Sequence, residues 1–271
     1  MSDTVNQQYI DWLSQVCNAQ VLDTQMIQPL WSGYGACFRA TLGYPNNTFA
    51  KNQDESSPSQ ESQYHQAQQN PLGAQQGGDE AALKVVVKCA TPPHRLSHPK
   101  GWNGEASHNR KCQSFKVENC FYSDVQVQTD ASCRTAKYLG HSQQGEASLL
   151  VMEDLAHSGY SRTASSLTAE QCITVLKWLA NFHARFVNVR DEFDSQSLQL
   201  WPEGTYWHLA TREDEFNAMS DGLLKQHAVD ISTTLGNAHY HTLVHGDAKV
   251  ANFCFTEDFS DCAAVDFQYV G

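Results

Sequence analysis

The chain has 271 residues, 41% of them hydrophobic, so it can bury a full core either as one large domain or as two lobes. Its net charge of −12 argues against a general nucleic-acid-binding protein and against a protein that binds anionic membrane surfaces. The sequence has neither an apolar run of about 18 residues nor a basic segment followed by an apolar one at its start. We therefore expect no transmembrane helix and no signal peptide.

The cysteines indicate the cellular compartment, and the spacing of the histidines disfavours a zinc site. The nine cysteines are odd in number and form no C-x-x-C pair, a pattern typical of small apolar residues in a reducing environment. This pattern predicts a cytoplasmic protein. The histidines show no spacing typical of zinc ligands, so we predict no zinc site.

The N-terminal third begins with a helix and continues with strands. Residues 3–17 alternate apolar and polar side chains at helical spacing, which predicts an amphipathic helix. Residues 26–42 have the pattern of a strand, a glycine turn and a second strand. Gly33 and Gly35 in this turn suit an ordinary hairpin and, equally, a backbone that approaches a ligand closely. Residues 46–80 are rich in Gln, Ser, Asn and Gly, and predict a disordered insertion in a loop.

The next two elements each carry one charged residue of interest. Residues 83–90 predict a strand with Lys88 near its end. Residues 106–124 predict a helix, with Glu118 at the edge of its apolar stripe. A carboxylate in that position often faces a buried cation, and Lys88 is its natural partner. The alternative is that both side chains are solvated.

Two more strands are expected near residues 133–139 and 148–152, and the second runs into Glu153, Asp154 and Leu155. This change from apolar to acidic residues predicts a boundary between lobes. Thr168 and Gln171 form a capping box that starts a long helix. We expect this helix to bury a stripe of residues at helical spacing: Ile173, Leu176, Ala180, His183 and Val187.

An aromatic segment and a last helix precede the C-terminal motif. Residues 200–216 are dense in aromatic side chains, which either anchor a loop onto the core or line a substrate pocket; the first is favoured. A helix is predicted over roughly residues 214–228.

The most informative stretch is His245-Gly246-Asp247-Ala-Lys249-Val-Ala-Asn252, followed by Val265-Asp266-Phe-Gln268. Apolar segments at 239–244, 253–255 and 263–265 predict short strands around it. Two strands joined by a turn would bring Asn252 and Asp266 to the same end of a hairpin. Two carboxylates and an amide oxygen are the groups that phosphoryl transfer from Mg·ATP requires. The alternative is a surface loop in which these residues cap turns.

In this order of elements, the chain resembles the protein-kinase-like fold of small-molecule kinases. That group includes aminoglycoside phosphotransferases, choline kinases and the ecdysteroid-kinase-like family, and the last is the most similar. The resemblance is carried by residues 110–122, 151–155, 179–184, 245–247 and 265–268. It implies an α+β fold with two lobes. Residues 1–154 would form an antiparallel β N-lobe with one helix, and residues 155–271 a mainly helical C-lobe.

The resemblance also implies roles for single residues. Asp247 matches the catalytic base, and Asn252 and Asp266 match ligands of Mg²⁺. Lys249 matches a position where a lysine can steady the γ-phosphate. The residues that match the ATP-binding positions are the phosphate-covering glycines, the strand lysine with its helix partner, and the hinge: Gly33, Gly35, Lys88, Glu118, Glu153, Asp154 and Leu155.

The resemblance predicts a kinase that transfers a phosphoryl group from ATP to the hydroxyl of a small molecule. From the net charge, we expect neither nucleic acid nor a membrane as partner. Gly246 stands where protein kinases have Arg, and Gln268 where they have the Gly of D-F-G, so a protein kinase is disfavoured. Members of these families continue with further helices after the residue that matches Asp266. We therefore expect the C-lobe to be incomplete, which leaves a non-catalytic nucleotide-binding module as the alternative.

Overall fold

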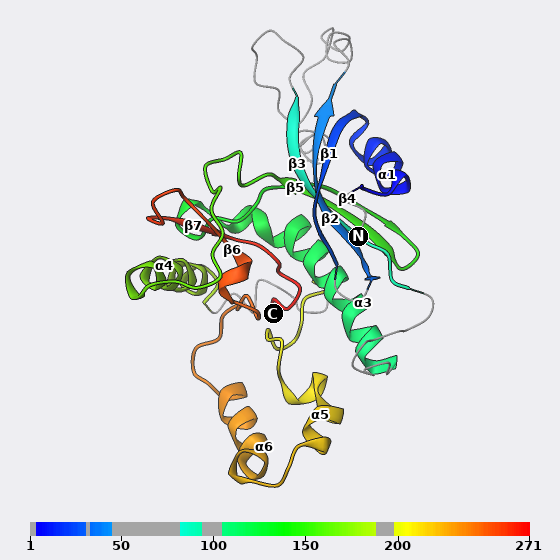
Figure 1. The fold of residues 1–271 in the computed structure, drawn as a ribbon. Coiled ribbons are helices and arrows are strands. Elements are labelled where there is room, and N and C mark those ends of the chain that lie inside the picture. The colour runs from blue at the N-terminus through cyan, green and yellow to red at the C-terminus, as the bar shows by residue number, and fades with distance from the viewer. Residues whose placement is uncertain (1–3, 31–32, 45–81, 94–104, 188–197) are drawn as a thin grey trace, which may run out of the picture. The chain divides into compact units, whose positions relative to one another are not determined.

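The computed structural model describes residues 4–30, 33–44, 82–93, 105–187 and 198–271 (Figure 1). The insertion predicted at 46–80 lies outside the described residues. The chain divides into two compact units, one made of Met1–His98 with Lys137–Asp154 and the other of Pro99–Ala136 with Leu155–Gly271. The predicted lobe boundary after residue 154 coincides with a boundary between these units. Residues 99–136, however, belong to the second unit and not to the first.

The first unit is built on a five-stranded antiparallel sheet in the order β1-β2-β3-β5-β4. Its strands alternate with short turns and long connections, and their bounds are β1 Gln20–Pro29, β2 Gly35–Gly43, β3 Leu83–Ala90, β4 Tyr138–Gln144 and β5 Ala147–Glu153. The antiparallel sheet of the predicted fold is thereby confirmed. The predicted hairpin around Gly33 and Gly35 forms between β1 and β2, and β3 has the bounds that the sequence predicts.

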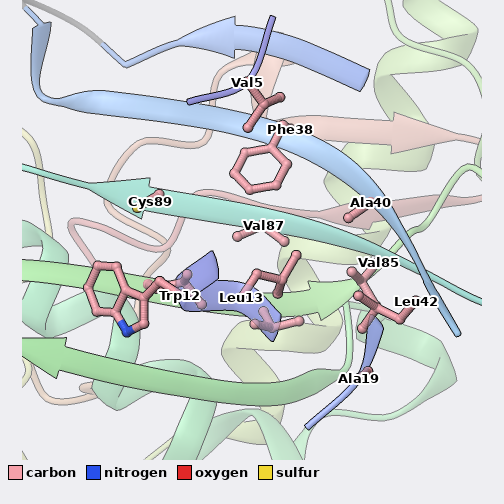
Figure 2. Close-up of a cluster of buried hydrophobic side chains, with 12 residues drawn as sticks. Val5, Trp12, Leu13, Ala19, Phe38, Ala40, Leu42, Val85, Val87 and Cys89 are labelled. Carbon is pink, nitrogen blue, oxygen red and sulfur yellow. The ribbon is translucent and has the colours of Figure 1, made fainter. Parts of the chain in front are cut away.

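Helix α1 (Gln7–Cys17) covers one face of this sheet (Figure 2). It starts after Asn6, whose side chain accepts a hydrogen bond from the backbone of Gln8 and so caps the helix. Trp12 and Leu13 pack in one buried cluster with side chains from the sheet. Burying a large apolar side chain contributes roughly 1.5–3 kcal/mol, so this face stabilises the unit. Alternation along β3 turns Val85 and Val87 toward α1 and Lys88 to the opposite face.

The first of the two later strands starts further along the chain than the sequence predicts. Cys133 belongs to a 3-10 turn, Ala131–Cys133, rather than to a strand. Asp130 caps this turn by accepting hydrogen bonds from the backbone and the hydroxyl of Ser132. A local side-chain cap of this kind competes with strand pairing, so β4 begins only at Tyr138.

The second unit is mainly helical, as predicted. Its described residues include four α-helices and one hairpin: α3 Glu105–Cys120, α4 Ala169–Arg185, α5 Glu213–Ala218, α6 Leu223–Gly236, β6 Phe253–Phe255 and β7 Cys262–Ala264. Helix α3 continues into a π-helical turn, Phe121–Val125. None of the helices in the described segments has the length and apolar content needed to span a bilayer.

Aromatic side chains form the core of the second unit and correct the buried face of α4. The rings of Phe121 and Phe267 stack with centroids 3.8 Å apart, and Trp178 stacks on Phe182 at 4.9 Å. The capping box of Thr168 and Gln171 is confirmed. The predicted stripe is wrong, because its members except His183 are exposed: Ile173, Leu176, Ala180 and Val187. The helix instead buries Trp178 and Phe182, since only these rings reach the aromatic core.

The single helix predicted at 214–228 is in fact two helices, α5 and α6. Helix α5 ends at Ala218, because the backbone of Met219 is extended. The ammonium of Lys225 donates hydrogen bonds to the carbonyls of Asn217 and Met219, which the helix leaves without partners of its own. Helix α6 lies apart from α3 and α4 (Figure 1) and buries no residue. It leaves several large apolar side chains in solvent: Leu223, Leu224, Val229, Ile231 and Leu235.

Candidate active site

The hairpin β6–β7 brings Asn252 and Asp266 to one end, as predicted. Phe253 pairs with Ala264, and one step further the backbone N–H of Val265 donates to the carbonyl of Asn252 at 2.9 Å. The strand predicted at 239–244 does not form. Its last residue, Val244, instead exchanges backbone hydrogen bonds with Gly271, of 3.0 and 3.4 Å.

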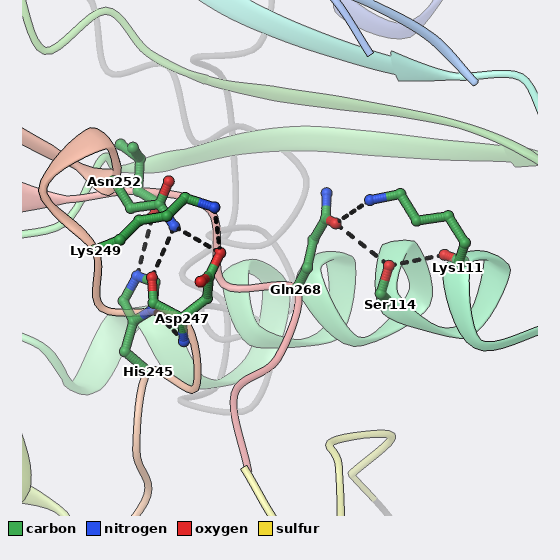
Figure 3. A network of polar contacts seen from close by, with 8 residues as sticks. Lys111, Ser114, His245, Asp247, Lys249, Asn252 and Gln268 are labelled. Carbon is green, nitrogen blue, oxygen red and sulfur yellow. Dashed lines mark hydrogen bonds and ion pairs between the residues drawn. The ribbon is translucent and has the colours of Figure 1, made fainter. Parts of the chain in front are cut away.

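Asp247 is held by two side chains from its own loop (Figure 3). The ammonium of Lys249 lies 2.7 Å from its Oδ2. The amide nitrogen of Asn252 donates to the same Oδ2 at 3.2 Å and to the backbone carbonyl of Asp247 at 2.8 Å. Both donors thus meet one carboxylate oxygen and fix the direction of the side chain. This arrangement orients the amide of Asn252 as well, since its nitrogen faces Asp247.

His245 is a positioning residue to which the sequence motif alone assigns no role. Its ring is buried, with Nε2 3.0 Å from the carbonyl of Val265 and Nδ1 accepting the backbone N–H of Asp247 at 3.3 Å. These contacts require a neutral ring with its proton on Nε2. Burial lowers the pKa of His245, against the opposing effect of the Asp266 and Asp247 carboxylates. The ring therefore links the backbone of Asp247 to that of Val265, the residue before Asp266.

Close packing against Tyr269 explains why position 246 is a glycine. Its φ is +79°, and a Cβ built on it would lie 1.9 Å from the carbonyl oxygen of Tyr269. A side chain of any size would push the two backbones apart. The carbonyl of Gly246 accepts the backbone N–H of Tyr206 at 2.8 Å.

The aromatic segment 200–216 anchors a loop onto the core, which confirms the favoured interpretation. The indole N–H of Trp201 donates to the carbonyl of Gln268 at 2.7 Å, and its ring stacks with Tyr269 at 6.3 Å. The guanidinium of Arg212 lies 4.4 Å from the ring centroid of Tyr206. These contacts hold the segment against the residues that follow Asp266.

Asp266 has a left-handed backbone, with φ of +68°. For a residue other than glycine this conformation costs about 1–3 kcal/mol and persists where the surroundings enforce it, often at a functional site. The donor set fits Mg²⁺, which kinase sites hold with an Asp carboxylate and an Asn side chain, leaving the remaining positions to water and phosphate. Among the described residues, no three His, Cys, Asp or Glu side chains gather as a metal site of their own.

Glu118 is buried in α3, and its Oε2 accepts a hydrogen bond from Nε2 of Gln268 at 3.3 Å. The residue predicted as its partner, Lys88, is half-buried on β3 of the first unit, between Cys37 and Leu150. The two residues belong to different units, so their ion pair stays a prediction.

The glycines of the first unit are explained by its strand pairing and turn. Gly35 has φ of +126°, and a Cβ on it would lie 2.0 Å from the carbonyl oxygen of Cys89, so the strand pairing itself requires glycine there. Gly33 has φ of +76°, and an added Cβ would meet no atom within 4 Å. Neither observation tests a contact with phosphate.

The segment Glu153–Leu155 spans the change of unit. The backbone N–H of Glu153 donates to the carbonyl of Lys137 at 3.0 Å. Asp154 is buried and forms an ion pair with Arg39 at 3.0 Å. Leu155 is buried, and its carbonyl accepts the backbone N–H of Tyr160 at 2.9 Å. These contacts fix the backbone of the segment that the resemblance identifies as the hinge. Its contact with adenine stays a prediction.

The sequence profile of the ecdysteroid kinase-like family matches residues 99–201. The resemblance to this family is confirmed over that segment. The ecdysteroid kinase-like segment includes Glu118 and the predicted hinge, but it stops before the loop that holds Asp247. No curated protein matches the chain significantly.

Two solved structures of WbdD are similar to the chain, one of them a co-crystal structure with the kinase inhibitor LY294002. Each matches with a TM-score of 0.35 and 14% sequence identity over 69% of this chain. The match covers 29% of one WbdD chain and 28% of the other, so this protein spans less than a third of their length.

Proposed function

We propose that the protein is an ATP-dependent phosphotransferase that transfers the γ-phosphoryl group to a hydroxyl of a small molecule. The observation that carries the proposal is the position of Asp247, held by Lys249 and Asn252 beside the hairpin end where Asp266 follows Val265. The ecdysteroid kinase-like match of residues 99–201 supports the same class of reaction.

In this proposal Asp247 orients the acceptor hydroxyl and accepts its proton. Lys249 and Asn252 both contact Oδ2, which keeps that oxygen in place and directs Oδ1 to the hydroxyl. When nucleotide is present, Lys249 would extend toward the γ-phosphate and stabilise the charge that develops on it. Asn252 and Asp266 would hold Mg²⁺, which supplies positive charge on the phosphates.

The residues that match the ATP-binding positions would hold the nucleotide. Lys88 would contact the α- and β-phosphates with Glu118 as its partner, Gly33 and Gly35 would lie over the phosphates, and backbone groups of Glu153, Asp154 and Leu155 would meet adenine. A cytoplasmic location completes the proposal and is supported by the odd number of cysteines without C-x-x-C pairs.

The test combines nucleotide binding with turnover. Wild-type protein is titrated with Mg·ATP by thermal shift, and ATP consumption is measured with a panel of amino alcohols, aminoglycosides and steroid alcohols. Asp247→Asn is expected to lower kcat by about 10²–10⁴-fold with little change in ATP affinity. Unchanged turnover in this variant would remove Asp247 as the base.

The same titration separates the enzyme from a non-catalytic module. Binding of Mg·ATP without consumption of ATP for any hydroxyl compound favours a nucleotide-binding module. Lys177→Ala is the control for substitutions in the motif, because Lys177 is an exposed residue of α4 in the same unit and is not part of the motif.

A further inference from the structure

Gln268 joins helix α3 to the segment that carries Asp266 (Figure 3). Its Oε1 accepts a hydrogen bond from Nζ of Lys111 at 2.6 Å, and its Nε2 donates to Glu118 at 3.3 Å. The hydroxyl of Ser114 lies 3.3 Å from the same Oε1 and 2.7 Å from the carbonyl of Lys111, so its one proton serves either acceptor. One amide thus contacts three side chains of one helix.

The orientation of this amide is determined by charge. Its oxygen faces an ammonium and its nitrogen faces a carboxylate. A flipped amide would place its N–H groups against the ammonium of Lys111 and its oxygen against the carboxylate of Glu118. Neither a cationic nor an anionic side chain at position 268 could satisfy both partners. Gln268 and Glu118 are both buried, and an unpaired polar group there is costly, so the contacts hold the backbone strongly.

The neighbouring residue holds the same segment by packing. Phe267 stacks on Phe121, which follows directly after α3, with ring centroids 3.8 Å apart and planes 11° from parallel. Asp266 comes just before these two anchors and has the strained φ of +68°. A strained conformation persists only where its surroundings enforce it. Gln268 and Phe267 supply this enforcement from adjacent positions.

We infer that Gln268 is a positioning residue, which sets the Asp266 carboxylate for Mg²⁺ by fixing its segment to α3. The inference rests on the proposed function, since it assigns Gln268 to the same reaction. Replacing a residue that orients a metal ligand without touching the metal typically lowers metal affinity by about 10–100-fold. Gln268→Leu is therefore expected to raise the Mg²⁺ concentration at half-maximal ATP binding by roughly tenfold or more.

The experiment measures Mg²⁺-dependent ATP binding by calorimetry at a series of Mg²⁺ concentrations, together with Mn²⁺ binding in the presence of ATP by electron paramagnetic resonance. Lys111→Met breaks the 2.6 Å contact from the helix side and is expected to raise the same midpoint. The double variant is expected to raise the midpoint by less than the two single effects combined, because both single variants lose the same contact between Lys111 and Gln268. Lys111→Met also keeps the test valid if Gln268→Leu does not fold.

Gln126→Leu is the matched control. Gln126 is a partly buried glutamine of the same unit, and its amide contacts Thr129 and Thr135, close to it in the chain. It is expected to leave the Mg²⁺ midpoint unchanged even if it lowers the melting temperature. A Gln268→Leu protein with a lower melting temperature but an unchanged midpoint contradicts the role of Gln268. Wild-type protein that binds no ATP at any Mg²⁺ concentration contradicts the proposed function itself.

Discussion

Lys249 lies two residues after Asp247 and places its ammonium 2.7 Å from Oδ2 of that residue. The positive charge of Lys249 thus lies directly beside the negative charge of the Asp247 carboxylate. A turn of 3-10 helix, Val250–Asn252, follows directly and returns the amide of Asn252 to the same oxygen. The first prediction depends on this pair.

Replacing Lys249 with alanine is expected to lower kcat by roughly 10²–10³-fold, because one donor to the developing charge is lost. ATP affinity should change little, since Lys88 and Mg²⁺ bind the nucleotide in the proposed arrangement. Steady-state kinetics and a Kd for ATP distinguish the two effects. If ATP affinity falls as steeply as kcat, Lys249 acts in ground-state binding instead.

Asp266 couples a strained backbone to a proposed metal ligand. Asp266→Gly should relieve the left-handed conformation and raise the free energy of unfolding by about 1 kcal/mol relative to Asp266→Ala. Both variants should lose Mg²⁺-dependent ATP binding, because both lack the carboxylate. Chemical denaturation and ATP titration with and without Mg²⁺ measure the two properties. Retained Mg²⁺ dependence in either variant would show that Asp266 is no ligand.

Gly246 should tolerate no side chain. Gly246→Ala is expected to cost about 3 kcal/mol or more of stability, since the new Cβ would overlap the carbonyl of Tyr269 in addition to adopting a positive φ. Gly159→Ala is the control, because Gly159 has φ of +95° but no atom within 4 Å of the added carbon. Its cost should stay near 1 kcal/mol. Equal losses in both variants would mean that Tyr269 moves aside easily.

One buried and two half-buried histidines predict that stability falls in mild acid. Burial lowers the pKa of His183, His208 and His245 below the usual 6.5, so each binds its proton less tightly in the folded state than in the unfolded chain. As the pH drops below about 6.5 the unfolded chain gains protons that the folded chain does not. For the buried His245 this lowers stability by up to about 1.4 kcal/mol per pH unit, and the half-buried His183 and His208 contribute less.

His245→Gln should lower the slope of stability against pH between about 6.5 and 5. The hydrogen-bonded carboxylates act at lower pH. The pKa of Asp258, for example, is lowered to about 2 by hydrogen bonds from Ser260 and Thr256. Urea denaturation at a series of pH values measures the slope. An unchanged slope in His245→Gln would place the acid sensitivity elsewhere.

The exposed side chains of α6 should contribute little to folding. Leu224 and Leu235 are 63% and 68% exposed, so Leu224→Glu and Leu235→Glu are expected to change stability by less than about 0.5 kcal/mol and to reduce self-association. Leu13→Ala, in the buried cluster under the sheet, should cost about 2–5 kcal/mol. Thermal unfolding and light scattering test the comparison. A large loss of stability in the α6 variants would show that these leucines are covered in solution.

The hairpin end with Asn252 and Asp266 could be predicted from sequence, because strand alternation and a short turn leave few ways to place two flanking residues. The face of α4 could not. Its apolar residues occupy several faces, and only the aromatic core of Phe121, Phe253 and Phe267, distant in sequence, decides that Trp178 and Phe182 turn inward. The contacts of Gln268 with α3 could not be predicted from sequence either, because nothing in the sequence around a single glutamine indicates its three partners on that helix.

The backbone near Asp247 is completed by residues far from it along the chain. Trp201 and Val244 form hydrogen bonds with Gln268, Val270 and Gly271, and Tyr206 donates to Gly246. A ribosome delivers the chain from its N-terminus at about 5–20 residues per second. Helices α3 and α4 can therefore form early during synthesis, while the loop stays unfixed until residues 268–271 have left the exit tunnel. A nascent chain would expose Asp247 and Lys249 for about 1–5 seconds before the backbone contacts around them can form.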